Sequence, residues 1–178
     1  MIQPELLPHY TISDYRQWQG DWELIDGIPY AMAPSPTVTH QRIGLKIARQ
    51  LDELLEKCAS CLALYETDWI VCENTVVCPD VMVICGNIEG DYPTQPPKII
   101  FEIISPSTAV QDERLKFELY REEGVTSYIL VYPEDKVAKL FELKDGQYVK
   151  VIETATGEYE FVLEENCRFT FDFSRIWP

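Results

Sequence analysis

The chain has little positive charge for its length. Its 178 residues include 15 lysines and arginines against 30 aspartates and glutamates, which gives a net charge of -15 at pH 7. No run of the sequence is rich in lysine or arginine. An acidic chain is repelled by phosphate backbones unless it gathers positive charge locally or recruits metal ions. The composition therefore argues against tight, non-specific DNA binding, and a nucleic-acid role would depend on divalent cations or a local basic rim.

Long apolar runs are also missing. None approaches the roughly 18 residues that a membrane-spanning helix needs, so we expect no membrane partner. The first ten residues, M-I-Q-P-E-L-L-P-H-Y, lack the basic start and apolar centre of a signal peptide, which predicts a cytoplasmic location. The length predicts one domain over residues 1–178, because domains usually have about 100–200 residues.

Histidines and paired cysteine motifs are scarce. The chain has two histidines and six cysteines, and only Cys58 and Cys61 form a CxxC motif. A structural zinc site usually takes two such motifs or one with spaced histidines. Without a secretory signal we expect reduced thiols, most of them buried as small apolar residues, with Cys58 and Cys61 as an exposed pair. The G-x-S-x-G motif is absent, so Ser105 and Ser107 are expected to be turn and cap residues rather than nucleophiles.

What the sequence does contain is an alternation of helical and strand patterns. The expected elements are a short helix at 11–18, a hairpin at 21–26 and 28–33, a helix at 39–57, strands within 61–67, 68–72 and 75–85, a loop at 86–97, a strand at 98–104, a helix from 109 to about 123, a strand at 127–132, a hairpin at 136–143 and 147–154, and one or two final strands. Thr108 and Gln111 match a capping box for the second long helix. This order predicts an α/β fold with a mixed sheet. We divide the domain into an N-terminal extension and hairpin at 1–35, a core at 36–135, and a C-terminal hairpin and tail at 136–178.

One acidic residue lies where a strand should be buried. Glu102 stands in the middle of K-I-I-F-E-I-I, and desolvating an unpaired carboxylate is expensive. A salt bridge to Lys98 or Lys116 would satisfy it. The other interpretation is that Glu102 acts on a metal ion or a substrate.

A second acid, Asp80, also stands among apolar residues on one face of an expected strand. Asp80 shares one face of its strand with Met82 and Ile84, as Glu102 does with Ile100 in the next strand, because side chains alternate along a strand. If the strands are neighbours, the two carboxylates face each other. A hard cation would relieve their repulsion, and Mg²⁺ suits such a pair. Taken alone, Asp80 after Pro79 is an ordinary strand start.

The following helix supplies further polar groups. Asp112, Lys116 and Tyr120 stand at i, i+4 and i+8, which places them on one face. If this helix packs back on the strand, Lys116 can reach Glu102, polarise a water and stabilise charge on a phosphate. The competing interpretation is a surface ion pair between Asp112 and Lys116, worth about 0.3–0.5 kcal/mol.

Together these motifs resemble a known family. The pair Pro79-Asp80 followed by Glu102-Ile103-Ile104 is similar to the bipartite motif of the PD-(D/E)XK nuclease superfamily. The longer pattern P-D-V-M-V, F-E-I-I-S-P-S-T, Asp112-x-x-x-Lys116-x-x-x-Tyr120 and G-V-x-x-Y-I-L-V resembles the Uma-type putative restriction endonuclease family. The early W-E-L-I-D-G segment and the helix with His40 fit the same family, and the resemblance covers about residues 11–150.

The resemblance implies a restriction-endonuclease-like fold and a metal-dependent phosphodiesterase site. Asp80 and Glu102 would be metal ligands, with the Ile103 carbonyl as a third and Mg²⁺ or Mn²⁺ as the ion. The superfamily lysine should stand two residues after the glutamate, where this chain has Ile104, so its role passes to Lys116. Glu23 and His40 would be a further motif acid or substrate contacts. Their ordinary interpretations are an exposed strand residue and a cap.

Three hypotheses about function follow. The first is a Mg²⁺-dependent endonuclease with Asp80, Glu102 and Lys116 as catalytic residues, acting on DNA rather than RNA and assembled as a homodimer. The second is a catalytically inactive binding or regulatory module with a nuclease fold, which the acidic charge favours. The third is a homodimer that binds protein partners through exposed tryptophans and tyrosines.

Overall fold

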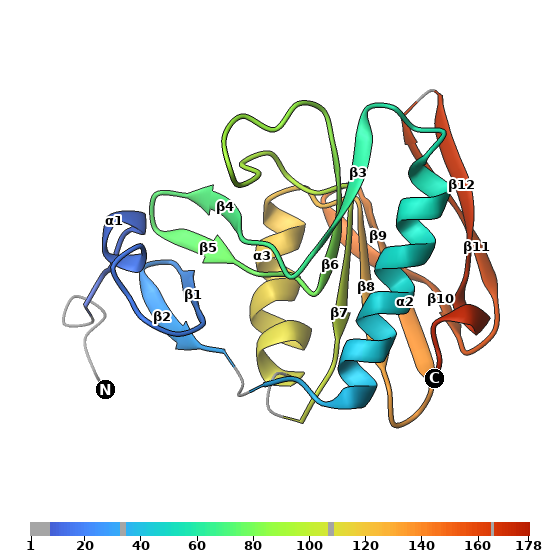
Figure 1. Ribbon diagram of the computed structural model, residues 1–178, viewed down its shortest axis with the longest axis horizontal. Coiled ribbons are helices and arrows are strands. Elements are labelled where there is room, and N and C mark those ends of the chain that lie inside the picture. The colour runs from blue at the N-terminus through green and yellow to red at the C-terminus, as the bar shows by residue number, and fades with distance from the viewer. Residues whose placement is uncertain (1–7, 33–34, 107–108, 165) are drawn as a thin grey trace.

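A six-stranded mixed sheet forms the centre of the molecule (Figure 1). The computed structural model describes residues 8–32, 35–106, 109–164 and 166–178. The sheet has the order β10-β9-β8-β7-β6-β3, in which β7 and β8 are parallel and the other neighbours are antiparallel. Its strands are β3 (Cys61–Tyr65), β6 (Val81–Cys85), β7 (Ile99–Ile103), β8 (Ser127–Tyr132), β9 (Val137–Lys144) and β10 (Gln147–Thr154). The expected α/β fold with a mixed sheet is confirmed.

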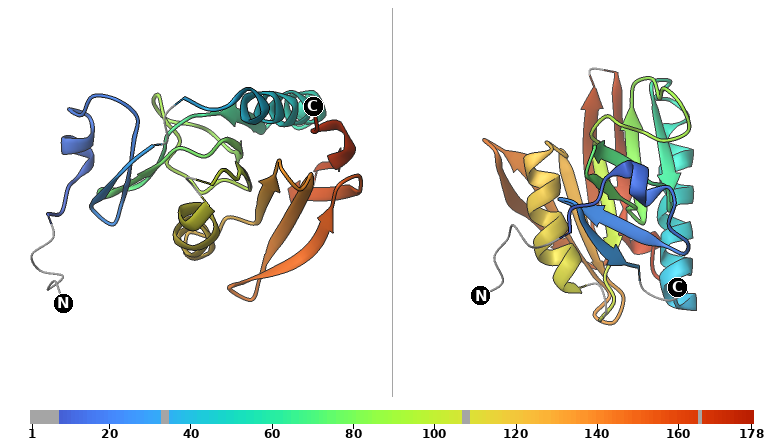
Figure 2. Two further views of the ribbon diagram at one scale, coloured as in Figure 1. Left: turned by 90° about the horizontal axis from the view of Figure 1, so that it is seen from below. Right: turned by 90° about the vertical axis from the view of Figure 1, so that its left-hand side faces the viewer.

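Helices cover the two faces of this sheet. The helix α2 (Val38–Leu55) lies on one face and α3 (Lys116–Glu122) on the other (Figure 2). Successive side chains of β7 point to opposite faces of the sheet. Phe101 packs in the core under α2, and Ile100 packs in the core under α3. Because side chains alternate along a strand, Glu102 points to the α3 side together with Ile100.

The sequence accounts for the position of α2. The Thr37 hydroxyl accepts a hydrogen bond from the His40 N–H at 3.2 Å and caps the helix. Ile43, Ile47 and Leu51 are fully buried at helical spacing. A side chain at Gly44 would lie 2.7 Å from the Tyr65 ring, so the glycine lets α2 approach β3 closely. No helix in the described ranges has the length and apolar character needed to span a membrane.

A second, four-stranded sheet joins the N-terminal hairpin to the core. Its order is β2-β1-β5-β4, with β1 (Trp22–Ile25), β2 (Ile28–Ala31), β4 (Trp69–Cys72) and β5 (Thr75–Val77). The turn between β1 and β2 has positive φ at Asp26 and Gly27, as a two-residue hairpin turn requires. This confirms the predicted hairpin, whose expected last residue, 33, lies outside the described residues. The short helix α1 (Ile12–Tyr15) precedes it.

The single strand expected at 75–85 is wrong, because two strands take its place. β5 ends at Val77 and belongs to the small sheet, whereas β6 begins at Val81 in the large sheet. Pro79 lies between them and has no N–H to give to a ladder. The break places Asp80 at the junction of the two sheets.

The chain ends in two hairpins. β9 and β10 turn on Asp145 and Gly146 as predicted, and the expected final strands are β11 (Glu158–Glu164) and β12 (Cys167–Asp172). β12 packs against α2, where the Gln50 amide donates to the Asp172 carbonyl and accepts from the Asp172 N–H. A 3-10 helix at Phe173–Arg175 follows.

The expectation of reduced cysteines is wrong for four of the six. Cys61 and Cys85 stand opposite each other in the β3–β6 register and form a disulfide, and Cys58 is bonded to Cys167. Cys58 and Cys61 are buried, so they are not an exposed pair either. The bonded partners are 109 and 24 residues apart, and only the tertiary fold brings them together. The cysteines therefore no longer support the inference of a reducing compartment.

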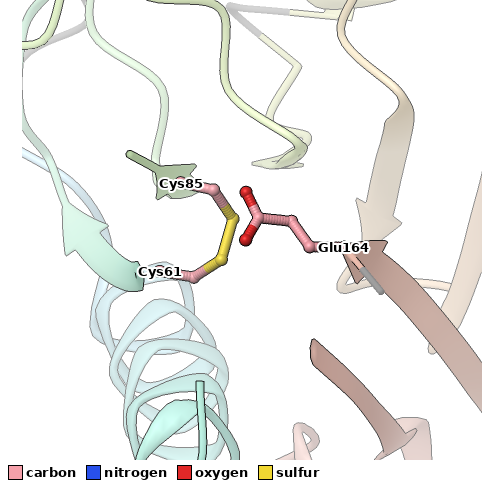
Figure 3. A group of neighbouring side chains, drawn as sticks. All are labelled: Cys61, Cys85 and Glu164. Carbon is pink, nitrogen blue, oxygen red and sulfur yellow. A yellow bond between two sulfur atoms is a disulfide. The ribbon is translucent and has the colours of Figure 1, made fainter. Parts of the chain in front are cut away.

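The Glu164 carboxylate lies beside the Cys61–Cys85 disulfide (Figure 3). It accepts a hydrogen bond from the Ser60 hydroxyl at 2.7 Å. Metal binding by cysteine needs a thiolate, which a disulfide sulfur does not offer. With the disulfide formed, the three residues offer no metal site. The hydrogen bond from Ser60 to Glu164 links the start of β3 to the C-terminal hairpin.

Candidate active site

The two acids of neighbouring strands meet at one end of the large sheet. The β6–β7 register pairs Val81 with Phe101, which brings Asp80 opposite Glu102. The Asp80 N–H donates to Glu102 Oε2 at 3.3 Å, and the Ile103 N–H donates to Asp80 Oδ2 at 2.6 Å. The backbone therefore holds both carboxylates in place.

Lys116 reaches these acids from the helix after β7. Its Nζ lies 2.8 Å from Glu23 Oε1, 3.0 Å from Glu102 Oε1 and 3.4 Å from Asp112 Oδ1. The lysine side chain is only 6% exposed. We call Glu23, Glu102, Asp112 and Lys116 the buried acid–lysine cluster. Because an ammonium group has three N–H donors, these three carboxylates match its full capacity.

A π-helical turn delivers Asp112 and Lys116. The helix predicted from residue 109 is α-helical at 109–110, π-helical over Gln111–Leu115 and α-helical again in α3, and the Lys116 N–H donates to the Gln111 carbonyl five residues back. Such wide turns leave a carbonyl in need of another partner, and the Tyr128 hydroxyl donates to the Asp112 carbonyl at 2.9 Å. The Gln111 amide donates to Glu23 Oε2 at 2.6 Å. Thr108, the other half of the expected capping box, lies outside the described residues.

Tyr120 and Cys78 donate further hydrogen bonds to the two buried glutamates. The Tyr120 hydroxyl donates to Glu102 Oε1 at 2.9 Å, one helical turn beyond Lys116. The Cys78 N–H donates to Glu23 Oε1 at 2.9 Å. Glu23 was expected as an exposed strand residue when taken alone, but it is 3% exposed. A buried carboxylate needs such partners, because leaving one unpaired is costly.

The buried cluster carries more negative than positive charge. Three carboxylates and one ammonium give a net charge of -2 when all four groups are ionised. Burial raises the pKa of Glu102 well above its usual value, and it also raises the pKa of Glu23, although Lys116 opposes both shifts. Burial lowers the pKa of Lys116, but Glu102 and Glu23 outweigh it and raise that pKa. Lys116 therefore stays an ammonium, which cannot take a proton from water.

A second group of side chains, which could hold a metal ion, lies nearer the solvent than the buried acid–lysine cluster. His40, Glu66 and Asp80 offer one ligand atom each, and these atoms all lie within 4.8 Å of one another. We call them the rim triad. His40 Nε2 lies 3.3 Å from Asp80 Oδ1, and both side chains are about one-sixth exposed. Burial lowers the pKa of His40, but the hydrogen bond and charge of Asp80 outweigh it, so that pKa is raised.

These donors fit a divalent cation. Carboxylates suit Mg²⁺ and Mn²⁺, and an imidazole adds a ligand that transition metals accept well. A cation bound beside these acids would stabilise the ionised forms of Glu23 and Glu102, which burial disfavours. Glu102 Oε1 already accepts hydrogen bonds from Lys116 and Tyr120, so its other oxygen is the one that faces Asp80.

The predicted site residues gather in one place. The structure brings together Glu23, His40, Asp80, Glu102, Ile103, Asp112, Lys116 and Tyr120. Sequence analysis missed Glu66, and it missed Gln111, Cys78 and Tyr128 as partners of the site. Glu66 directly follows β3 and has a positive φ, and its N–H donates to the Asp80 carbonyl at 3.0 Å. An acid after a strand is too common a pattern to have indicated this position.

Comparison with known proteins gives the family. The profile of the Uma2 family, described as putative restriction endonuclease, matches residues 12–164. The search of curated proteins found no match. Among solved structures, a crystal structure of a putative nuclease belonging to DUF820 from Anabaena variabilis is similar, with 14% identity and a TM-score of 0.65 over 79% of this chain and 83% of that chain. The chain therefore belongs to the Uma2 family of putative restriction endonucleases, and its fold is restriction-endonuclease-like.

Proposed function

We propose that the protein is a metal-dependent endonuclease that hydrolyses phosphodiester bonds of DNA. One observation carries the proposal. Asp80, directly before β6, lies opposite Glu102 of β7 and donates its N–H to Glu102 Oε2, and Lys116, the lysine displaced in the family pattern, lies 3.0 Å from Glu102 Oε1. We interpret this arrangement as a PD-(D/E)XK site whose lysine is supplied by the following helix.

In this proposal some residues hold the metal ion, and Lys116 orients the carboxylates. Asp80, with Glu102, His40 and Glu66 as further candidate donors and the Ile103 carbonyl as another, would hold Mg²⁺ or Mn²⁺. Such an ion, when bound, polarises a phosphoryl oxygen and lowers the pKa of a water. Lys116 keeps Glu23 and Glu102 oriented and cannot act as the base, because it remains protonated. One of its N–H groups becomes available to a phosphate when a carboxylate turns to another partner.

The competing proposal is an inactive binding or regulatory module. It is favoured by the burial of Lys116, whose three donors already face carboxylates, and by the net charge of -15. Calorimetry with Mg²⁺ and with Mn²⁺ separates the two proposals. A folded protein that binds neither ion and cuts no nucleic acid would be the inactive module.

Cleavage of supercoiled plasmid DNA in Mg²⁺ or Mn²⁺ tests the enzyme. We expect nicked and linear products from the wild type, and rates at least about a hundredfold lower for Asp80→Asn and Glu102→Gln, because each removes a candidate ligand of an ion that contributes several kcal/mol of charge stabilisation. Glu160→Gln is the matched control, because Glu160 is an exposed acid on β11, far along the chain from the site. Equal cleavage by all four proteins would contradict the assignment. A parallel assay with RNA tests the preference for DNA.

We also propose a homodimer as the working unit. Cutting both strands of a duplex takes two sites of opposite polarity, which a two-fold axis supplies. Sedimentation velocity at several concentrations tests this. A wild-type protein that linearises plasmid while sedimenting only as a monomer would contradict it.

A further inference from the structure

The outer face of α2 carries a line of positive charge. Arg42, Lys46 and Arg49 stand at i, i+4 and i+7, which places them on one side of the helix, and Arg42 and Arg49 are exposed. These residues are not adjacent in the chain, and the stripe exists only in the helical spacing. The expectation that the chain has no basic stripe is therefore wrong.

The C-terminus adds a fourth cation to this line. Arg175 follows β12 and lies beside α2, where both Arg49 and Arg175 contact Glu53. Lys46 donates to the Trp177 carbonyl. A surface hollow of about 300 Å³ is lined by Lys46, Arg49, Gln50 and Arg175. Among the described residues no carboxylate lines it, although Glu53 contacts two of these arginines from outside the hollow. Four cations and Glu53 leave a local charge of +3 on a chain whose total charge is -15.

The dimensions of this stripe match a phosphate backbone. Arg42 and Arg49 are seven residues apart, which is about 10 Å along a helix axis. One strand of DNA carries about three phosphates over that length. The same helix begins at the candidate site, since His40 lies in its first turn. His40 and Arg42 lie on different sides of α2, because two residues turn the helix by about 200°. A backbone bound along the stripe would therefore reach the rim triad by passing round the N-terminal end of this helix.

We propose that Arg42, Lys46, Arg49 and Arg175 form a track that binds the phosphate backbone of DNA and leads it to the active site. This proposal rests on the proposed nuclease function, which it deepens by naming the substrate-binding surface. The chain outside the track carries a net negative charge that repels a polyanion, so the track also favours one side for the approach of DNA. Base edges play no part in this contact, and the track reads no sequence.

Binding of a fluorescent 20-base-pair duplex, measured by anisotropy in EDTA over a range of salt concentrations, tests the track. The test variant replaces Arg42, Lys46, Arg49 and Arg175 by glutamine. The control replaces Lys136, Lys139, Lys144 and Lys150 of the β9–β10 region by glutamine, which changes the net charge equally. A third variant, Arg42→Lys with Arg49→Lys and Arg175→Lys, keeps the charge and guards against a merely structural effect.

We expect at least about tenfold weaker binding for the track variant and a salt slope lower by about three to four, since each lost phosphate contact removes about 0.9. The control and the lysine variant should bind within about twofold of the wild type. Equal weakening of the control and track variants would overturn the proposal, as would unchanged binding by the track variant. A change in sedimentation without a change in DNA binding would also overturn it, because the patch would then join two copies of this acidic chain.

Cleavage of a small phosphodiester, bis(p-nitrophenyl) phosphate, separates failure of the track from failure of the enzyme. The track variant should retain wild-type cleavage of this compound in Mn²⁺ while losing cleavage of plasmid. Wild-type cleavage of the small diester with no duplex binding by any variant would overturn the track and leave the nuclease. Track-dependent duplex binding without cleavage of either substrate would support the track and overturn the nuclease.

Discussion

At the scale of single residues, Lys116 decides the energetics of the site. Its ammonium is the cation in contact with Glu23, Glu102 and Asp112. Removing one partner of a buried ion pair leaves uncompensated charge and costs about 3–5 kcal/mol. We therefore expect Lys116→Met, which keeps the length of the side chain, to lower the free energy of unfolding by about that amount in urea titrations.

An exposed lysine provides the comparison for Lys116. Lys144→Met, on the surface at the end of β9, should change stability by less than about 0.5 kcal/mol, as surface substitutions usually do. If Lys116→Met were equally mild, the three carboxylates would have to be hydrated or protonated at little cost. The buried cluster would then be of minor importance to the fold.

Asp68, which lies outside the buried acid–lysine cluster but shares Cys78 as a neighbour with Glu23, gives the protein a further pH dependence. Burial raises the pKa of this carboxyl above 3.8, while hydrogen bonds from Tyr15 and Cys78 only partly oppose the shift. The folded state therefore binds the proton more tightly than the unfolded state, and this contribution to stability is lost as the pH rises through the folded pKa. We expect Asp68→Asn, which still accepts from Tyr15, to gain stability relative to the wild type between pH 4 and pH 7.

Unfolding in urea at several pH values measures this difference. Asp52→Asn, a change at an exposed aspartate of α2, should follow the wild-type curve. A difference between Asp68→Asn and the wild type that stays constant over this pH range would show that Asp68 does not titrate there.

At the scale of elements, one disulfide joins the segment after α2 to β12, and the other joins the start of β3 to its neighbouring strand β6. Loop closure in the unfolded chain predicts stabilisation of about 5 kcal/mol for a 109-residue separation and about 3.5 kcal/mol for 24 residues. The double substitution of Cys58 and Cys167 by serine should therefore destabilise more than that of Cys61 and Cys85. Guanidinium unfolding without reductant measures both.

Thiol titration checks the pairing itself. The unfolded, unreduced protein should expose two thiols, those of Cys72 and Cys78, and six after reduction. Six thiols before reduction would contradict both disulfides. Equal losses in the two serine variants would instead contradict the dependence on loop length.

The elements that the sequence predicted well are those with strong local chemistry. The hairpin turn at Asp26-Gly27 and the alternation around Glu102 each depend on neighbours within a few residues. The π-helical turn at Gln111–Leu115 was not predicted, because the hydrogen bond to its Asp112 carbonyl comes from Tyr128 of β8, outside the helix. The disulfide pairs were missed for the same reason.

At the scale of the whole molecule, the site is an assembly of distant segments. Glu23 comes from β1, His40 from α2, Glu102 from β7 and Lys116 from α3. The sequence pattern and the family resemblance named these residues, but packing decides the contacts between them. Glu66 had no local signal, and the stripe on α2 required the helix to be seen in three dimensions.

The charge of this assembly leads to a prediction about cations that needs no substrate. Acids in excess of bases at one point of the fold should bind Mg²⁺ or Mn²⁺, and an ion bound only by the folded state raises its stability by about 2.7 kcal/mol at 100 times the Kd. We expect Mn²⁺ to raise the thermal midpoint of the wild type and of Glu160→Gln. Asp80→Asn removes a carboxylate from the rim triad while keeping an acceptor for the Ile103 N–H, so its midpoint should respond much less. NaCl at matched ionic strength separates binding from screening of the net charge of -15. If all three proteins gained equally in Mn²⁺ and in NaCl, general screening would be the cause, and Asp80 would have no part in holding a metal.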